Sequence, residues 1–151
     1  MEQTLILIKP DAIEKKLTGI ILSRFEALGL EIVAAKALCA TEKLLREHYA
    51  NLAGSPFLDG VLHFMMGDYN HLPDHRLYAF VLRGENAIAR VRETLGATNP
   101  EKAAPWTLRG QFGSFKNDVM QNCVHASSSA EDAAREISLW FRPEEILPCE
   151  K

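Results

Sequence analysis

Four short apolar runs are spaced along the chain, and each has the length of a β-strand. The first run, at residues 5–8, is apolar at every position and ends at Lys9-Pro10. A continuous run of this kind is typical of a strand that is buried on both faces. The other three runs cover residues 32–39, 77–82 and 122–126. We therefore expect four strands.

Between these runs, apolar residues recur every three or four positions, which is the spacing of one face of an α-helix. This period predicts helices over residues 17–28 and 85–95. Gly29 and Gly96 follow these segments directly. A glycine at this place commonly ends a helix, because it adopts the left-handed conformation at little cost.

Capping residues predict where three further helices begin. Thr41 and Ser129 each precede a helical pattern, and their hydroxyls can accept a hydrogen bond from the first turn. Ser55-Pro56 can open another short helix, because proline is well tolerated at the first helical position. The last helix carries an apolar stripe that consists of Ala133, Ile137, Trp140 and Phe141.

Two segments show neither period. Residues 67–75 are polar and rich in turn-forming residues, so we expect a loop. Residues 97–120 show no sustained period, which predicts a long and mostly irregular segment. Segments of this length without regular structure are uncommon in compact domains and are often functional.

The order of these elements indicates an α+β fold, with one sheet covered by helices. Its best match among small domains is the ferredoxin-like, or split βαβ, arrangement with a four-stranded antiparallel sheet. The chain of 151 residues contains no internal repeat, linker or low-complexity stretch. We therefore expect a single domain over residues 1–151.

Composition narrows the classes of function. Hydrophobic residues make up 47% of the chain, which is enough for a substantial core. The formal net charge of -3 argues against a general nucleic-acid binder, although a small anionic ligand needs only a local cationic pocket. The three cysteines include no CxxC pair, which argues against a zinc site or a disulfide framework. The N-terminal apolar run is too short for a signal sequence or a membrane span, so we expect a cytoplasmic protein.

Three cations stand where the local pattern gives each of them a candidate role in binding a ligand. The chain has neither a G-x-x-x-x-G-K-[ST] loop nor a G-x-G-x-x-G motif, so an enzyme acting on phosphates must hold them with side chains. Lys9 ends the first strand, Arg92 borders the inward face of a helix, and Arg109 lies in the long irregular segment. Each one alone also fits a solvated or surface-packed charge.

His125 is a candidate nucleophile. It lies in the apolar run 122–126, and its unperturbed pKa of about 6.5 leaves a neutral ring nitrogen at pH 7. Glu136, on the last helix, can hold and polarise this ring, and Ser127 can bond Glu136 as well as cap the helix. The alternative is a hydrogen-bonded structural histidine beside a solvated helix charge. To the other histidines, His48, His63, His71 and His75, we assign no catalytic role.

The segment Asn122-Cys123-Val124-His125-Ala126-Ser127 resembles the N-x-x-H-[GA]-S active-site signature of the nucleoside diphosphate kinases. Further segments resemble motifs of the same family in the same order, and they cover residues 7–11, 48–57, 92–100, 105–112 and 136–143. The resemblance spans nearly the whole chain. Six motifs in the right order make it very specific.

The resemblance implies a ping-pong kinase that moves the γ-phosphate of a nucleoside triphosphate, mainly ATP, to a nucleoside diphosphate. His125 would be the nucleophile, phosphorylated on its pros nitrogen, Nδ1. Glu136 would orient it, with Ser127 in support, and Tyr49 would contact the transferring phosphoryl group. The resemblance also implies the residues that bind the nucleotide. Lys9 and Asn122 would contact the ribose hydroxyls and nearby phosphate oxygens, and Arg92, Thr98 and Arg109 would contact the phosphates. Phe57 and Val61 would contact the base.

The resemblance also implies partners and a cofactor. Mg²⁺ would bridge the nucleotide phosphates, with no direct protein ligand, and the chain would form a homo-oligomer, either a tetramer or a hexamer. Ser128, Trp106 and Gln111 depart from the family pattern, which commonly has Asp, Gly and Asp at these places. Extra residues lie within 67–75 and between Phe112 and Asn122. These departures bear on the affinity for metal and nucleotide.

Two other classes of function compete with the enzyme. The first is a catalytically silent nucleotide-binding module on the same fold, since a fold alone does not imply activity. The presence of both His125 and Glu136 favours the enzyme. The second is an RNA-binding ferredoxin-like domain, which would need exposed aromatic residues on the strands and a basic face. The acidic net charge argues against it.

Overall fold

The computed structural model describes residues 1–116 and 118–149. Its main sheet contains β1 (Glu2–Ile8), β2 (Glu31–Leu38), β3 (Leu77–Gly84) and β6 (Val124–Ala126). The strand order is β2-β3-β1-β6, and all three neighbouring pairs are antiparallel. The predicted α+β fold with a four-stranded antiparallel sheet is therefore confirmed.

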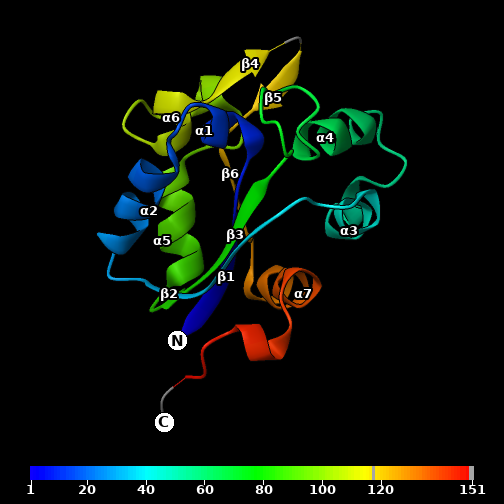
Figure 1. The fold of residues 1–151 in the computed structure, drawn as a ribbon. Helices are drawn as coiled ribbons and strands as arrows, with labels where there is room; N and C mark the ends of the chain where they lie inside the picture. The colour runs from blue at the N-terminus through cyan, green and yellow to red at the C-terminus, as the bar shows by residue number, and fades with distance from the viewer. Residues whose placement is uncertain (117, 150–151) are drawn as a thin grey trace.

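Helices cover both faces of this sheet (Figure 1). The α-helices are α1 (Pro10–Glu14), α2 (Thr18–Glu26), α3 (Glu42–His48), α4 (Leu58–Met65), α5 (Ala87–Leu95), α6 (Leu108–Phe112) and α7 (Ala130–Trp140). Three 3-10 turns, η1 (Ala50–Leu52), η2 (Pro100–Lys102) and η3 (Pro143–Glu145), join or extend them. In Figure 1, α2 and α5 lie on one side of the sheet, and α3, α4 and α7 lie on the other.

The continuous apolar run of β1 is explained by two cores. Leu5 and Leu7 pack into the core on the side of α3, α4 and α7, whereas Ile6 and Ile8 pack into the core on the side of α2 and α5. Successive side chains of a strand point to opposite faces, so a strand between two helical layers needs apolar residues at every position. All four side chains are fully buried.

The predicted helix starts are confirmed by their caps. The hydroxyl of Thr41 accepts a hydrogen bond from the backbone N–H of Leu44 at 3.1 Å, before α3. The hydroxyl of Ser129 accepts a hydrogen bond from the backbone N–H of Asp132 at 3.0 Å, before α7. The helix expected after Ser55-Pro56 is also present, although α4 begins at Leu58.

The expectation of a mostly irregular segment over residues 97–120 was wrong in part. This segment contains η2, α6 and a hairpin of β4 (Ser114–Lys116) and β5 (Val119–Gln121). Elements of three to five residues are too short to establish a hydrophobic period, so the sequence pattern did not reveal them. The same reason applies to α1, which begins with Pro10 at its first turn.

The last strand is shorter than its apolar run. The prediction covered residues 122–126, but β6 begins at Val124. Cys123 has a φ of 70°, in the left-handed region, so the backbone cannot be extended there. This turn separates Asn122 from the strand that carries His125.

Gly96 connects the end of α5 to the loop that carries α6. Its φ is 85°, and a Cβ atom at this position would collide with the side chain of Thr107. Thr107 caps α6 by accepting a hydrogen bond from the N–H of Gly110 at 3.1 Å. The carbonyl oxygen of Gly96 accepts a hydrogen bond from Arg109 at 3.2 Å. The sequence assigned Gly96 only the end of a helix, whereas the structure makes it a packing point for the Arg109 segment.

We expect Gly96→Ala to lower the free energy of unfolding by roughly 2–4 kcal/mol, because backbone strain and a collision act together. Gly54→Ala is the matched control. Gly54 has a φ of 80° but open space where a Cβ would lie, so strain alone should cost about 1 kcal/mol. Urea unfolding of both variants measures the difference. Equal losses would show that Thr107 moves aside freely.

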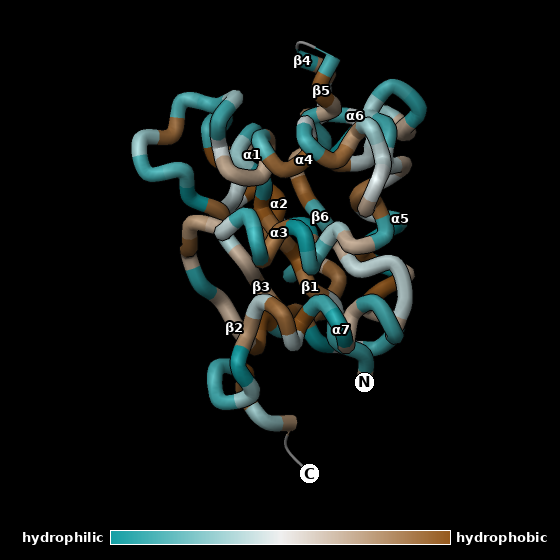
Figure 2. The backbone as a smooth tube through the Cα atoms, turned by 90° about the vertical axis from the view of Figure 1, so that its right-hand side faces the viewer, coloured by the Kyte–Doolittle hydropathy of each residue, from teal (hydrophilic) through white to brown (hydrophobic). Residues whose placement is uncertain are grey.

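Hydrophobic positions concentrate on the central strands, and hydrophilic positions predominate in the peripheral loops (Figure 2). Among the residues that the structure describes, no helix has the length and apolar character needed to cross a membrane.

Candidate active site

His125 lies in the middle of β6, opposite Leu7 of the neighbouring strand β1. Two hydrogen bonds tie the turn before β6 to the end of β1. The N–H of Lys9 donates to the carbonyl of Cys123 at 2.9 Å, and the N–H of Cys123 donates to the carboxylate of buried Asp11 at 3.1 Å. Residues that are more than 100 positions apart in the chain therefore meet at one end of the sheet.

Glu136 and Ser127 hold the ring of His125. The Nε2 atom of His125 lies 3.0 Å from Oε1 of Glu136. Ser127 donates to the same oxygen at 2.7 Å and accepts from the backbone N–H of Leu5 at 3.1 Å. An ionised carboxylate only accepts hydrogen bonds, so Nε2 must carry the proton of the neutral ring. The Nδ1 atom then keeps its lone pair.

Burial keeps His125 neutral. It lowers the pKa of His125, and the nearby Lys9 and Arg109 lower it further, while Glu136 opposes them. Burial by itself would raise the pKa of Glu136, but the hydrogen bonds from His125 and Ser127 prevail, so its pKa is lowered. At pH 7 the pair is therefore a neutral imidazole and a carboxylate. The side chain of His125 is 16% exposed, which leaves it open to a ligand.

Lys9 and Asn122 form a second contact group beside the histidine. The Nζ atom of Lys9 donates to Oδ1 of Asn122 at 2.7 Å. The amide of Asn122 in turn donates to the carbonyl of Thr98 at 2.9 Å. Burial, together with the charge of Arg109, lowers the pKa of Lys9 to about 8. Lys9 is therefore not the solvated strand-end charge that its position alone also allowed.

Arg109 is buried and joins three segments. It donates to the carbonyl oxygens of Asn122 at 3.3 Å, Gly96 at 3.2 Å and Val124 at 2.6 Å. Burial and the neighbouring Arg92 lower its pKa to about 10, so it stays charged at pH 7. A guanidinium has five N–H donors, which leaves two for a ligand after these three bonds.

Arg92 is exposed on α5, and its Nη1 atom lies 3.4 Å from the hydroxyl of Ser128. Thr98 is also exposed. Because Ser128 is neutral, the cation of Arg92 has no carboxylate partner at this position. Lys9 and Arg109 thus act on His125, while Arg92 lies beside Ser128 and is close enough to Arg109 to lower its pKa.

Tyr49 has a hydroxyl without a hydrogen-bond partner in the described part of the chain. The residue follows α3 directly, and the hydroxyl is buried. Burial, followed by the charge of Glu136, raises the pKa of Tyr49 well above its usual range, so the phenol keeps its proton. Buried polar groups are normally paired, which makes this hydroxyl a candidate ligand contact.

Phe57 and Val61 lie on the α4 side. The ring of Phe57 is 74% exposed at the start of α4, and Val61 is partly buried against the core. No hydrogen bond or ring contact joins Phe57 to His125 among residues 1–116 and 118–149. An exposed aromatic face is nevertheless suited to stacking against a flat ligand.

The prediction missed His48, which we had assigned no part in the site. Its ring lies 4.4 Å from the ring of His125, at an interplanar angle of 80°. Its Nδ1 atom accepts a hydrogen bond from the indole of Trp140 at 3.0 Å. The helical period already placed His48 on the same apolar face as Leu45. A histidine on a buried face was the signal that could have revealed it.

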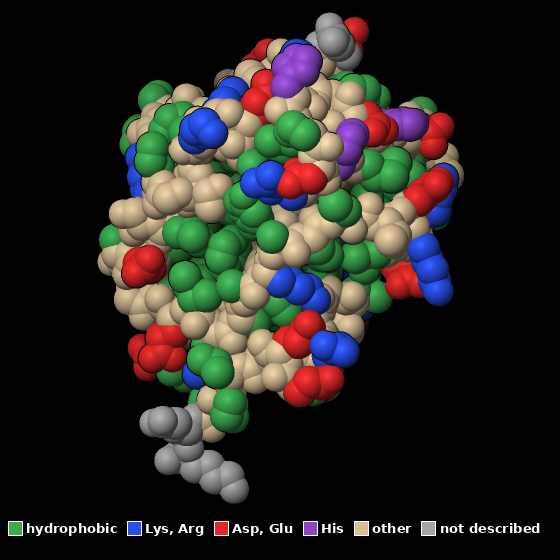
Figure 3. All heavy atoms as spheres, in the orientation of Figure 1, with side chains coloured by type: hydrophobic (Ala, Val, Ile, Leu, Met, Phe, Trp, Pro, Cys, Tyr) green, Lys and Arg blue, Asp and Glu red, His purple; other side chains and the backbone are tan. Residues whose placement is uncertain are grey.

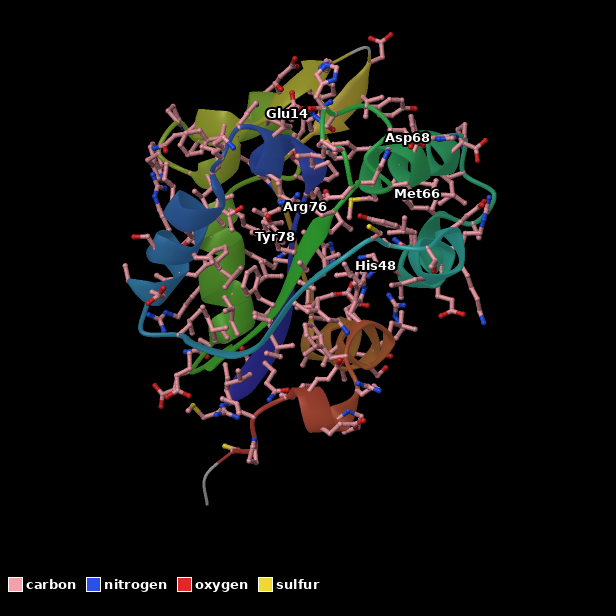
Figure 4. All side chains as sticks on the ribbon, in the orientation of Figure 1. Glu14, His48, Met66, Asp68, Arg76 and Tyr78 are labelled. Atoms are coloured by element: carbon pink, nitrogen blue, oxygen red, sulfur yellow. The ribbon has the colours of Figure 1, made fainter. Side chains whose placement is uncertain are left out.

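The polar loop at residues 67–75 is present as predicted, and other elements hold it in place. The N–H of His71 donates to Glu14 of α1 at 3.1 Å, and Asp68 lies 2.6 Å from Nδ1 of His63 (Figure 4). The cavity beside this loop is lined by residues of α1, α2 and β3, and none of them belongs to the predicted site.

One group of three metal-ligand side chains, His48, His125 and Glu136, has its ligand atoms within 4.8 Å of one another. Two imidazoles and a carboxylate suit zinc better than magnesium, which prefers oxygen ligands. The oxygen of Glu136 that faces His125 already accepts two hydrogen bonds. The other oxygen, Oε2, accepts no hydrogen bond within the described residues, but one carboxylate oxygen beside two imidazoles is a poor ligand set for magnesium.

Comparison with known proteins identifies strong similarity over the whole chain. The model of the family "Nucleoside diphosphate kinase" matches residues 2–146. A protein of that name from Carboxydothermus hydrogenoformans is 42% identical over 151 residues, which cover 100% of this chain and 95% of the relative. One from Pyrococcus furiosus is 41% identical over 146 residues, which cover 97% and 86%.

Solved structures give the same result. The nucleoside diphosphate kinase of Aquifex aeolicus superposes with a TM-score of 0.85 at 40% identity, covering 97% of this chain and 99% of that one. A transition-state mimic of the enzyme from Borrelia burgdorferi, with bound vanadate and ADP, has a TM-score of 0.85 at 33% identity, covering 99% and 92%. The fold is thus shared with these structures, at 33–40% sequence identity.

Proposed function

Because this chain belongs to the nucleoside diphosphate kinase family, we propose that it transfers the γ-phosphate of a nucleoside triphosphate, mainly ATP, to a nucleoside diphosphate. We assign the transfer to a ping-pong mechanism through His125. The observation that carries this assignment is the hydrogen bond between Nε2 of His125 and Glu136, which leaves Nδ1 as the free nucleophile. The alternative of a silent nucleotide-binding module has no comparable support, because no hydrogen bond within the described residues occupies Nδ1 of His125.

In the first half-reaction, the lone pair of Nδ1 attacks the γ-phosphorus, and the bond from phosphorus to the bridging oxygen breaks. The nucleoside diphosphate leaves with the electron pair of that bond. The ring becomes cationic as the nitrogen–phosphorus bond forms, and Glu136 stabilises this charge through Nε2–H. In the second half-reaction, a phosphate oxygen of the acceptor diphosphate attacks the same phosphorus, and Nδ1 is the leaving group.

Phosphoryl transfer depends chiefly on in-line placement and on neutralisation of charge. We assign the phosphate contacts to Arg92, Thr98 and Arg109, and the contact with the transferring group to the unpaired hydroxyl of Tyr49. Arg109 is already oriented by three backbone carbonyls, so it loses little freedom when it binds a phosphate. Donors that are preorganised in this way stabilise a developing charge most effectively.

We assign the ribose hydroxyls and nearby phosphate oxygens to Lys9 and Asn122, which are already joined by a hydrogen bond. The base would lie against Phe57 and Val61. Every base offers a flat face, so apolar contact of this kind tolerates different bases. Broad acceptance of nucleotides is the expected consequence.

Mg²⁺ would be held by the phosphate oxygens of the nucleotide. Two observations support this arrangement: the cations Lys9 and Arg109 act on His125, and Oε1 of Glu136 is engaged by His125 and Ser127. When bound, the metal neutralises phosphate charge. Ser128 can contact the hydration shell of the metal only through a neutral hydroxyl, in place of the carboxylate that many relatives carry.

We further propose one domain over residues 1–151, of which residues 117, 150 and 151 lie outside the described part, acting in the cytoplasm as a tetramer or hexamer. On the face in Figure 3, cationic and anionic side chains are interspersed. This distribution does not favour binding of RNA, which needs a continuous basic surface.

Intact-mass spectrometry tests the proposed function. The purified protein is mixed with ATP and Mg²⁺, and we expect a single acid-labile phosphoryl adduct that disappears when GDP is added. Demonstrable ATP binding without any adduct would favour the silent nucleotide-binding module.

A further inference from the structure

His48 is a buried titratable residue that the proposed mechanism leaves unused. It is the last residue of α3 and is 2% exposed. Figure 4 shows it on the side of α3 that faces the sheet. Its ring meets that of His125 edge to face at 4.4 Å and that of Trp140 in the same manner at 5.6 Å. His48 thus separates the core tryptophan from the nucleophile.

Trp140 determines the tautomer of His48. An indole N–H can only donate, so Nδ1 of His48, at 3.0 Å, must accept and carries no proton. Burial, followed by the charge of His125, lowers the pKa of His48 to about 3. The ring is therefore neutral at physiological pH, and its single proton is on Nε2.

The Nε2–H group of His48 faces Glu136. The Nε2 atom lies 4.0 Å from Oε2 of Glu136, and it has no hydrogen-bond partner within the described residues. The other oxygen, Oε1, is taken by His125 and Ser127. At 4.0 Å the contact is an interaction of a dipole with a charge, which is strong in a buried, weakly polarisable setting.

We propose that His48 is a positioning residue for phosphoryl transfer: held by Trp140, it stabilises and aligns Glu136, which in turn orients the ring of His125. This inference rests on the proposed function. The chain of contacts runs from Trp140 to His48, from His48 to Glu136, and from Glu136 to His125. His48 touches neither nucleotide nor phosphate in this proposal.

Other charges face the same group, and they stay in place when His48 is changed. Arg135, on the same helix as Glu136, lies 3.9 Å from Oε2. Lys9 and Arg109 act on His125 from the end of β1 and from α6, and Tyr49 lies beside Glu136. These groups act equally in the wild-type protein and in a His48 variant. A difference in rate or pH profile between the two therefore reports the contribution of His48.

Loss of the Nε2–H dipole removes a stabilising partner of the ionised carboxylate, so the pKa of Glu136 rises. Glu136 then keeps its proton to higher pH, and a protonated Glu136 no longer stabilises the cationic ring. In a variant without this dipole, the acid limb of the pH profile for phosphohistidine formation therefore moves to higher pH.

The test compares His48→Phe with His48→Gln in rapid-quench measurements of phosphohistidine formation from ATP and Mg²⁺. Phenylalanine keeps the ring shape without a donor, and we expect formation to be about ten-fold slower, because the buried charge of Glu136 loses a stabilising dipole. Glutamine retains an N–H near the same place and should restore most of the rate. Nucleotide affinity and cooperative unfolding should be retained in both variants.

A double-mutant cycle with Glu136→Gln tests whether His48 acts through Glu136. The double variant His48→Phe/Glu136→Gln should be no slower than Glu136→Gln alone. Independent, multiplying effects would overturn the proposal, and so would a His48→Phe variant with the wild-type rate and pH profile.

Nitrogen-15 NMR of the free protein separates this inference from the proposed function. His48 should be the Nε2–H tautomer, and His48→Phe should shift the tautomer populations of His125. A Nδ1–H tautomer for His48, or an unchanged His125 in the variant, would overturn the inference whether or not the protein transfers phosphate. A wild-type protein that forms no adduct would instead refute the proposed function.

Discussion

His125→Ala is expected to abolish phosphoryl transfer, with a loss on the order of 10⁴-fold or more, while nucleotide binding is retained. In the proposed mechanism the Nδ1 lone pair receives the phosphoryl group, and no other described side chain of the site has a free nitrogen of this kind. The phosphate contacts assigned to Arg92 and Arg109 do not depend on the imidazole. Binding and turnover should therefore separate in this variant.

The assay combines steady-state transfer from ATP to GDP with intact-mass detection of the adduct. His71→Ala is the matched control, because His71 is exposed in the polar loop and its recorded contact with Glu14 is made by its backbone N–H. It should keep wild-type activity. Retained turnover or a retained acid-labile adduct in His125→Ala would refute the assignment of the nucleophile.

Arg109→Ala is expected to slow both half-reactions by roughly 100-fold or more and also to destabilise the fold. In the proposed mechanism both half-reactions use the same phosphate site, so donor and acceptor nucleotides should be affected together. The fold suffers because the carbonyls of Asn122, Gly96 and Val124 lose a buried donor. Unpaired buried carbonyls of this kind should lower the free energy of unfolding by about 3 kcal/mol or more.

Arg92→Ala is the comparison that separates these two effects. Arg92 is exposed. Within the described residues its side chain donates one hydrogen bond, to the hydroxyl of Ser128 at 3.4 Å. Its removal should reduce transfer but change the free energy of unfolding by less than about 0.5 kcal/mol. Rapid-quench kinetics of each half-reaction and urea unfolding supply the measurements. An effect of Arg109→Ala on one half-reaction alone would show that the two nucleotides do not share a site.

Local patterns revealed most of the elements because the physical cause of each is local. Thr41 and Ser129 cap their helices with hydroxyls that reach only three residues along the chain. The apolar run of β1 required two covered faces, whichever helices supplied them. Capping residues and the spacing of apolar residues are therefore enough to locate strands and long helices in the sequence. It is not enough for α1, α6 or the β4–β5 hairpin, which are too short to repeat a period.

The signature at residues 122–127 likewise indicates His125 as the candidate nucleophile, and the motif on the last helix indicates Glu136 as its partner. What the pattern could not supply was the state of the ring. That state depends on which nitrogen faces the carboxylate and on how deeply the pair is buried. The orientation of the ring and its burial both depend on the packing of α7 against β1, which lies more than 120 residues earlier in the chain.

The sequence by itself thus determined the family resemblance, the order of the main elements and the candidate for the reacting residue. Only the tertiary structure decided that Arg109 supports three backbone segments and that His48 lies against His125. The hydrogen bond from Trp140 to His48 joins residues 92 positions apart. No periodicity or motif encodes such a contact, because it exists only after two helices have packed against the same sheet and excluded water from between them.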